Sequence, residues 1–214
     1  MAPTNHKKPA LKIRHKMLKK FWVALPLVGV LAGAYLLVLV YSPELNSSSP
    51  RPQSQWNEPV PQKAKYNEQR VYIPRLNLNL RYEDSQRALD TGLWHRYPER
   101  GDPKKGGNFI LAGHRFQLGF TPGETVQKSP LYHVDQVQVG DYIYVDFEGS
   151  RYRYEVTKRY TVKPQQTEIE AASTQAKMTL YTCTFSGESD GREVLEAELV
   201  EKNIGSKLKV GTST

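Results

Sequence analysis

The 214-residue chain carries 30 Lys and Arg against 22 Asp and Glu, and its mean hydropathy of −0.61 excludes a polytopic membrane protein. Seven of the basic residues lie in residues 1–20, which hold no acidic residue, so the remainder is nearly neutral with 23 basic and 22 acidic side chains. A basic surface for nucleic acid is therefore not predicted for the folded part. The single cysteine, Cys183, excludes an intramolecular disulfide and disfavours a structural zinc site.

Residues 21–41 form an uncharged apolar segment, FWVALPLVGVLAGAYLLVLVY, which is long enough to cross a bilayer as a helix. Basic residues precede it, so the positive-inside rule predicts a cytoplasmic tail over residues 1–20 and an extracytoplasmic remainder. A cleaved signal peptide is the alternative. Its apolar region usually spans only ~7–15 residues, and no clear cleavage site follows residue 41. We therefore expect an uncleaved single-pass anchor in the cell membrane.

Residues 42–70 are rich in Pro, Ser, Gln and Asn, which is typical of an extended, solvated linker. Its prolines are expected to prevent a helix, and they are Pro43, Pro50, Pro52, Pro59 and Pro61. The pattern of alternating apolar and polar residues begins at Val71, so residues 71–205 are interpreted as one extracytoplasmic domain and residues 206–214 as a tail.

Apolar alternation and turn residues predict mostly strands within this domain. In chain order, we first expect a strand over 71–82, a short helix over 84–89, a loop over 98–107, a strand over 108–112 and a long loop over 117–130. A hairpin of 141–147 and 151–162, with its turn at Gly149, and a short helix over 167–172 should follow. The last expected elements are a strand over 177–185, a turn over 186–191 and a strand over 193–202. This pattern favours an all-β domain with short helices, built as a small closed or nearly closed β-barrel.

Three residues at expected strand ends could carry chemistry. Cys183 lies late in one strand, Arg192 follows across a turn, and His114 ends the strand over 108–112. The thiolate is the nucleophilic form of cysteine, and neighbouring imidazolium and guanidinium groups favour it. Histidine can protonate a leaving amine, whereas arginine can stabilise an oxyanion. The set suits acyl transfer at an amide through a thioester, although a packed, inert cysteine is the alternative that composition alone leaves open.

The motif T-L-Y-T-C at residues 179–183 resembles the TLxTC signature of sortases, the membrane-anchored cysteine transpeptidases of bacterial surfaces. The resemblance covers most of residues 71–202 and continues in segments 73–74, 93–98, 107–115, 129–132 and 139–141. The order and spacing of these segments, together with the anchor and the linker, make the resemblance specific.

The resemblance implies a closed eight-stranded β-barrel and a catalytic triad of His114, Cys183 and Arg192. It also implies cleavage of an LPxTG-like sorting signal of a surface protein at its Thr–Gly bond. The acyl group would pass through a Cys183 thioester to an amine of a cell-wall precursor or of a pilin or surface-protein lysine. Thr182 is a further candidate for substrate contact. No cofactor is implied, and the acceptor amine and the sortase class stay open.

The other candidate site residues are interpreted as structural or solvated. His6 and His15 belong to the cytoplasmic tail, and His95 and His133 are assigned no catalytic role. Some sortases bind calcium, but the loop residues Glu124, Glu168 and Glu170 do not form a dense ligand set, so no metal is expected.

Three alternatives compete with the sortase resemblance. L,D-transpeptidases carry an S-H-G-C-like signature, whereas Tyr181 and Thr182 precede the cysteine here. Papain-like cell-wall peptidases place the cysteine before the histidine in the chain, and here the order is reversed. A membrane-anchored β-barrel binding module with an inert Cys183 is the remaining alternative, and thiol reactivity would distinguish it.

Overall fold

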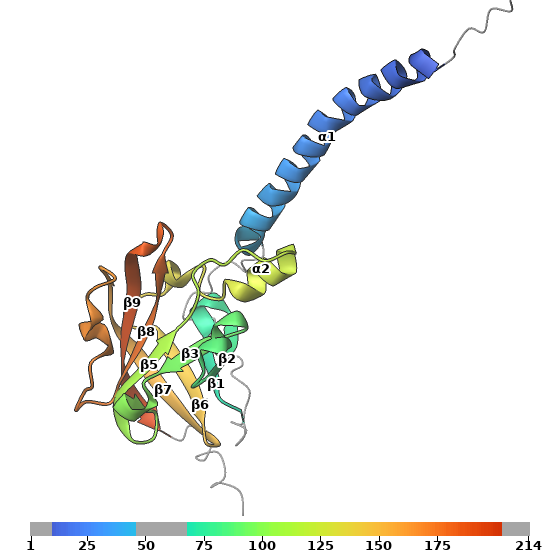
Figure 1. The fold of residues 1–214 in the computed structure, drawn as a ribbon. Helices are drawn as coiled ribbons and strands as arrows, with labels where there is room; N and C mark the ends of the chain where they lie inside the picture. Colours follow the sequence, from blue (N-terminus) through green and yellow to red (C-terminus); the bar gives the residue numbers. More distant parts are fainter. Residues whose placement is uncertain (1–9, 46–67, 203–214) are drawn as a thin grey trace, which may run out of the picture.

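The computed structural model describes residues 10–45 and 68–202, which form one long helix and a β-barrel (Figure 1). Helix α1 (Ala10–Leu45) projects from one end of the barrel. Its stretch Leu25–Leu45 is long and apolar enough to cross a membrane, and most of it is exposed. The predicted tail over 206–214 and most of the predicted linker fall on residues outside the described ranges.

Helix α1 extends to Leu45 and includes Pro43, although prolines from residue 43 onward were expected to prevent a helix. A proline has no backbone N–H for the carbonyl four residues earlier, which here belongs to Leu39. The hydroxyl of Ser42 donates to that Leu39 carbonyl at 2.8 Å. The side chain thus replaces the missing backbone bond, so the last turn persists.

The barrel domain holds nine strands, of which eight close a ring. They are β1 (Arg70–Ile73), β2 (Leu78–Glu83), β3 (Leu93–Arg96), β4 (Gly101–Asp102), β5 (Gly106–Ala112), β6 (Tyr142–Phe147), β7 (Ser150–Val162), β8 (Lys177–Thr184) and β9 (Gly187–Lys202). The sheet order is β3-β2-β1-β6-β7-β9-β8-β5-β4, and an added β3–β5 pairing closes the ring without the two-residue β4. The predicted closed eight-stranded barrel is confirmed.

The expected single strand over residues 71–82 is wrong, because it is two antiparallel strands, β1 and β2. Pro74 begins a 3₁₀ turn, Pro74–Leu76, between them. Asn77 then takes a left-handed conformation with φ of 53°, which reverses the chain. Asparagine tolerates this region better than most residues. By contrast, the hairpin of β6 and β7 forms as predicted, with Glu148 and Gly149 at positive φ in a two-residue turn.

A second helix, α2 (Pro122–Lys128), lies inside the segment 117–130, which was expected to be a loop. The Thr121 hydroxyl accepts a hydrogen bond from the Glu124 N–H at 3.2 Å, and Pro122 occupies the first helical position. An N-cap followed by proline is a regular way to begin a helix. Helix α2 packs against α1 and so places the end of α1 beside the barrel (Figure 1).

Two apolar clusters lie on opposite faces of the sheet. The larger one fills the barrel and includes Val71, Phe109, Leu111, Ile143, Val145, Leu180 and Leu195, all fully buried. The smaller one consists of Ile110, Ala112, Ile169, Tyr181 and Val194. Because side chains alternate between the faces of a strand, Leu111 and Leu180 point inward, and Ile110 and Tyr181 point outward. The outer cluster forms the floor on which the candidate site is built.

Candidate active site

Cys183 and Arg192 are Cα partners in the antiparallel pair of β8 and β9. The next pair is Thr184 with Gly187, so residues 188–191 are extra in β9 and form a bulge beside Cys183. The chain therefore turns at residues 185–186, not over the expected 186–191. A bulge redirects the side chains beside it, and this one lies directly at the predicted nucleophile.

The bulge holds the Arg192 guanidinium in place through backbone carbonyls. Nη1 of Arg192 donates to the carbonyl of Glu188 at 2.7 Å and to that of Gly191 at 3.1 Å. Within residues 10–45 and 68–202, no ion pair joins Arg192 to a carboxylate. The guanidinium therefore keeps its positive charge available to a substrate oxyanion.

Cys183 is half-buried, and its burial raises the pKa of its thiol. The Arg192 charge opposes this effect and lowers the same pKa, while the Glu188 carboxylate raises it. Burial therefore decides the direction, so the thiol is mainly protonated at neutral pH. A base or a cation is needed to reach the reactive thiolate.

His114 follows the end of β5, which pairs in parallel with β8. That pairing continues one residue beyond the strand, because the Gly113 N–H donates to the Tyr181 carbonyl at 3.2 Å. On its other side, the His114 carbonyl accepts from the Leu131 N–H at 3.1 Å. The register places His114 alongside Cys183, since Ala112 pairs with Tyr181 two residues earlier on both strands.

The sheet order β9-β8-β5 thus places Arg192 on one side of Cys183 and His114, just beyond the end of β5, on the other. Burial lowers the pKa of His114, and Lys128 lowers it further, whereas Asp90 and Glu188 raise it. Glu188 therefore acts on both His114 and Cys183. Neither Glu188, Asp90 nor Lys128 was a sequence candidate, because the sequence does not show which charged side chains the fold brings near Cys183 and His114.

The loop between β7 and β8 is fastened to the outer face of the sheet below Cys183. The Tyr181 hydroxyl donates to Glu170 at 2.5 Å, and Glu170 forms a 2.8 Å ion pair with Arg96. The Asn108 amide donates to the Ile169 carbonyl at 3.2 Å and to that of Ala171 at 2.8 Å. These contacts hold the 3₁₀ turn Thr167–Glu170 over the apolar floor.

Thr182 lies on the face of β8 opposite to Cys183, together with Leu180. Its side chain is 2% exposed, and its hydroxyl has no hydrogen-bond partner among the residues that the structure describes. The hydroxyl is therefore not brought to the other three residues. The backbone of Thr182 is the part that adjoins Cys183.

An aromatic group borders the site on the side of the β8–β9 turn. Tyr132 makes edge contacts with Phe116 and Phe185, at ring-centroid distances of 6.2 and 5.0 Å. The Arg115 guanidinium lies 3.9 Å from the Phe185 ring centre and pairs with Glu193 and with Asp135, the latter at 2.7 Å. Arg115 is 4% exposed, so this ion-pair group is part of the structure that supports the neighbouring His114.

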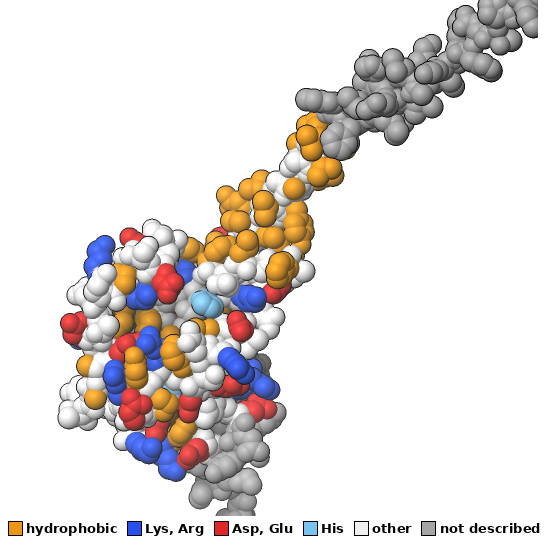
Figure 2. Space-filling view, in the orientation of Figure 1, with side chains coloured by type: hydrophobic (Ala, Val, Ile, Leu, Met, Phe, Trp, Pro, Cys, Tyr) orange, Lys and Arg blue, Asp and Glu red, His pale blue; other side chains and the backbone are white. Residues whose placement is uncertain are grey.

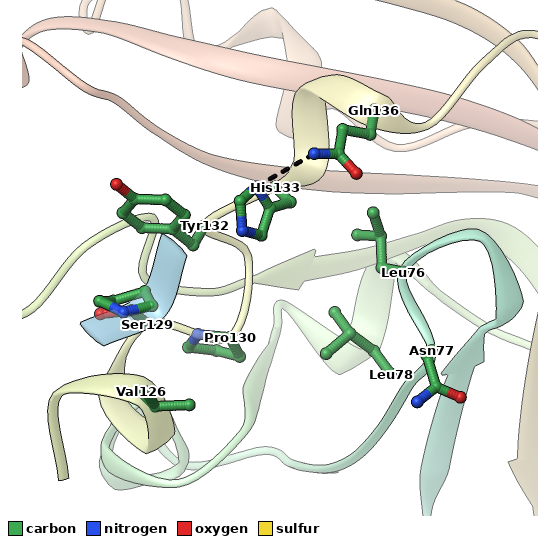
Figure 3. Close-up of a pocket in the computed structure, with 10 residues that line it drawn as sticks. Leu76, Asn77, Leu78, Val126, Ser129, Pro130, Tyr132, His133 and Gln136 are labelled. Carbon is green, nitrogen blue, oxygen red and sulfur yellow. Dashed lines mark hydrogen bonds between the residues drawn. The ribbon is translucent and has the colours of Figure 1, made fainter. Parts of the chain in front are cut away.

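His95 and His133 both lie apart from the three residues. His95 is buried in β3, where its ring nitrogens contact Asp84 at 2.8 Å and the Gly101 carbonyl at 3.1 Å. His133 lines a pocket of about 180 Å³ with Leu76, Leu78, Val126 and Tyr132 (Figure 3). Its Nδ1 contacts the Gln136 amide at 3.2 Å. This pocket adjoins the end of α1, and none of Cys183, His114 and Arg192 lines it.

The glutamates considered for calcium fall in two places: Glu124 is in α2, whereas Glu168 and Glu170 share the 3₁₀ turn Thr167–Glu170. Glu124 forms an ion pair with Lys128 at 2.7 Å within α2, and Glu170 belongs to the Arg96 and Tyr181 group. Over the described ranges, no group of three or more His, Cys, Asp or Glu side chains is arranged to hold a metal ion.

Comparison with known proteins identifies the family. The family model for the sortase domain matches residues 71–200, which is more than half of the chain. The chain belongs to the sortase family. Its members are cysteine transpeptidases, and the matched range contains all three predicted catalytic residues.

Individual relatives agree with this membership. A Bacillus subtilis (strain 168) protein named "Putative sortase YwpE" is 28% identical over 104 residues, which cover 48% of this chain and 93% of that protein. Among solved structures, sortase C-3 of Streptococcus pneumoniae aligns at a TM-score of 0.54 and 23% identity, covering 81% of each chain. Sortase A of Listeria monocytogenes aligns at a TM-score of 0.52 and 23% identity, covering 65% of this chain and 90% of that one. The fold is thus shared with sortases of different classes.

Proposed function

We propose that this sortase cleaves an LPxTG-like sorting signal through a thioester on Cys183 and transfers the acyl group to an amine. The supporting observation is that Arg192 and Cys183 are paired on β9 and β8, while His114 lies two residues beyond the end of β5, the strand on the other side of β8. Family membership supplies the reaction class, and this arrangement supports the assignment of the three roles.

In the proposed reaction, the Cys183 sulfur attacks the carbonyl carbon of the Thr–Gly bond. The Arg192 guanidinium stabilises the negative charge that develops on the carbonyl oxygen. The C–N bond then breaks, and His114 as imidazolium gives its proton to the leaving amine. Neutral His114 next takes a proton from the incoming amine, which attacks the thioester carbon and releases the Cys183 thiolate.

Both pKa directions bear on this scheme. Burial raises the pKa of Cys183 and lowers that of His114, so the thiolate–imidazolium pair is a minor form at every pH. The Arg192 charge lowers the thiol pKa and thereby enlarges this fraction. Arg192 would thus contribute twice, once to the nucleophile and once to the oxyanion.

We further propose that α1 anchors the enzyme in the cell membrane with residues 1–20 in the cytoplasm and the barrel outside. One apolar helix of spanning length and the basic residues before it support this orientation. The substrates would be surface proteins with sorting signals, and the acceptor would be an amine of a cell-wall precursor or of a pilin or surface-protein lysine. The backbone of Thr182 adjoins Cys183, so the proposal includes a contact between the Thr182 N–H and the substrate.

The experiment combines the full-length protein in detergent with an LPxTG-type peptide and triglycine, and follows the joined product by mass spectrometry. The proposal predicts a product joined at the threonine, its loss with Cys183→Ala, and near-complete loss with His114→Ala. Alkylation of Cys183 in the same sample tests the binding-module alternative. A thiol that is inert to alkylation and a peptide that stays uncut would refute the transpeptidase assignment.

A further inference from the structure

The surface next to the anchor helix exposes several large apolar side chains. Among residues 68–202, six large hydrophobic residues are exposed, and three of them, Phe116, Leu118 and Phe120, fall within the segment 116–120 that leads from His114 to α2. Phe120 is 86% exposed, the highest value among them. Such a concentration on one short segment indicates a contact with an apolar partner.

The position of segment 116–120 along the anchor helix indicates which apolar partner it meets. The Tyr35 hydroxyl of α1 donates to the Phe120 carbonyl at 2.7 Å. Leu39, Ser42 and Pro43 are buried further along the helix, and they lie at helical spacing from Tyr35 on one face. This face of α1 therefore packs on the barrel domain, which fixes segment 116–120 at the height of Tyr35.

The opposite side of α1 at that height remains apolar and exposed. Leu36, Leu37 and Val40 are 53%, 60% and 43% exposed, and hydrophobic side chains cover the helix down to its junction with the barrel domain (Figure 2). A helix with this surface requires lipid around it at the level where segment 116–120 is bound. The same lipid would surround Phe120.

The position of Tyr35 along α1 also indicates how deep segment 116–120 would lie in the membrane. Tyr35 precedes Tyr41, the last residue of the apolar segment, by six residues, which corresponds to ~9 Å along the helix axis. Interfacial segments bury their apolar side chains roughly 5–10 Å into the boundary of headgroups and acyl chains. The charged residues nearby, Glu124 and Lys128, pair with each other at 2.7 Å, which reduces the cost of placing them near the membrane.

From these contacts we infer that segment 116–120 inserts Leu118 and Phe120 into the outer leaflet beside the anchor helix. The partner is the lipid bilayer, and the inference rests on the membrane anchoring in the proposed function. Phe120 lies six residues after His114, so the insertion holds the candidate active site close to the membrane surface and restricts tilting of the barrel.

Nitroxide labels test the inference in the full-length protein, in the Cys183→Ala background so that each variant has one cysteine. The test positions are Phe120→Cys and Leu118→Cys, and the control positions are Val30→Cys in the middle of the anchor and Val200→Cys in β9. The control Val200 is also an exposed aliphatic residue, at 45%. It lies eight residues from Arg192 along β9, or roughly 26 Å in an extended strand.

Each labelled protein is reconstituted in phosphatidylcholine–phosphatidylglycerol vesicles, and collisions with oxygen and with a water-soluble nickel chelate are compared. The inference predicts that oxygen dominates at Val30→Cys, Phe120→Cys and Leu118→Cys, with a collision ratio several-fold above that at Val200→Cys. Circular dichroism verifies that each variant is folded. Because there are two test positions, the inference can still be tested if one of the two variants does not fold.

The outcomes separate this inference from the proposed anchoring. Lipid contact at Val30→Cys with water contact at both test positions would overturn the insertion and leave the anchor standing. Water contact at Val30→Cys would overturn the anchoring, and the insertion with it. Shielding of Phe120→Cys from both reagents would indicate a protein partner, such as a second copy of this chain, and would overturn lipid insertion.

Discussion

Cys183 and Arg192 face each other across β8 and β9 at the last regular pair before β9 bulges. The bulge supplies the two carbonyls that hold the guanidinium, so one irregularity of the sheet fixes the position of Arg192. Position and charge of Arg192 can therefore be tested separately.

Substitution of Arg192 should separate its two roles. Arg192→Lys keeps a positive charge near Cys183, so the pH dependence of thiol alkylation should change little, but lysine lacks the planar fork. Loss of such a group from an oxyanion site lowers the rate by on the order of 100-fold, which we expect for peptide transfer. Arg192→Gln should lower transfer similarly and also shift alkylation to higher pH. Equal transfer rates for Arg192→Lys and the native enzyme would contradict this role.

Glu188→Gln should move the pH profile of the enzyme to lower pH. The Glu188 carboxylate raises the pKa of both Cys183 and His114, so its neutralisation lowers both. The thiolate then forms at lower pH, and both limbs of a bell-shaped transfer profile shift in the same direction. Alkylation rates and kcat/KM measured against pH provide the test. Glu148→Gln, in the turn of the other hairpin, serves as the control and should leave both profiles unchanged.

Gly113→Ala should reduce turnover without unfolding the protein. A methyl group on Gly113 would lie 2.7 Å from Cδ2 of Leu93 and 2.8 Å from Cδ1 of Leu131, so these side chains must shift. Leu131 bonds the His114 carbonyl, and its movement displaces the histidine. Misplacement of about 1 Å costs up to ~100-fold in rate. Gly123→Ala, which meets nothing within 4 Å, should keep full activity. Equal activity of the two variants would argue against this positioning of His114.

Arg115→Ala should destabilise the fold, because it removes the close ion-pair partner of the largely buried Glu193 and leaves only Arg159, at 4.0 Å, as a cation paired with it among the described residues. Removing one partner of a buried ion pair costs about 3 kcal/mol of unfolding free energy. Denaturant titration of the full-length protein in detergent measures the loss. The control is Arg153→Ala, which breaks a partly exposed pair with Glu201 and should cost under ~1 kcal/mol. A similar small loss for both variants would exclude a structural role for Arg115.

Several elements could be predicted from the sequence because their signals are local. The Thr and aromatic residues of segment 177–185 predicted β8, and a turn centred on Gly149 between two strand-like runs predicted the β6–β7 hairpin. The motif at residues 179–183, with the upstream histidine and downstream arginine, predicted which side chains the barrel brings to neighbouring strands. Family membership confirmed the fold, whereas the catalytic roles stay predictions.

Other features depend on interactions that the sequence does not display. Residues 188–191 are polar, so their sequence is typical of a turn. Only the pairing of β8 with β9 beside Cys183 shows that they form a bulge within β9. The parallel register of β5 and β8 joins residues about 70 positions apart, so His114 could be assigned to a strand end but not to a neighbour. Two missed features did have local signals. Thr121 and Pro122 form a regular helix N-terminus, which indicates α2, and Pro74 indicates the break between β1 and β2.

The measurement that tests the central claim most directly is the intact mass of the full-length protein after brief incubation with an LPxTG-type peptide. The account predicts a mass gain equal to the N-terminal peptide fragment through threonine, removed by hydroxylamine and absent in Cys183→Ala. The contradicting result has two parts. The protein cleaves a sorting-signal peptide and its Cys183 thiol alkylates rapidly, yet the protein shows no mass gain. That result would exclude a Cys183 thioester as the acyl carrier.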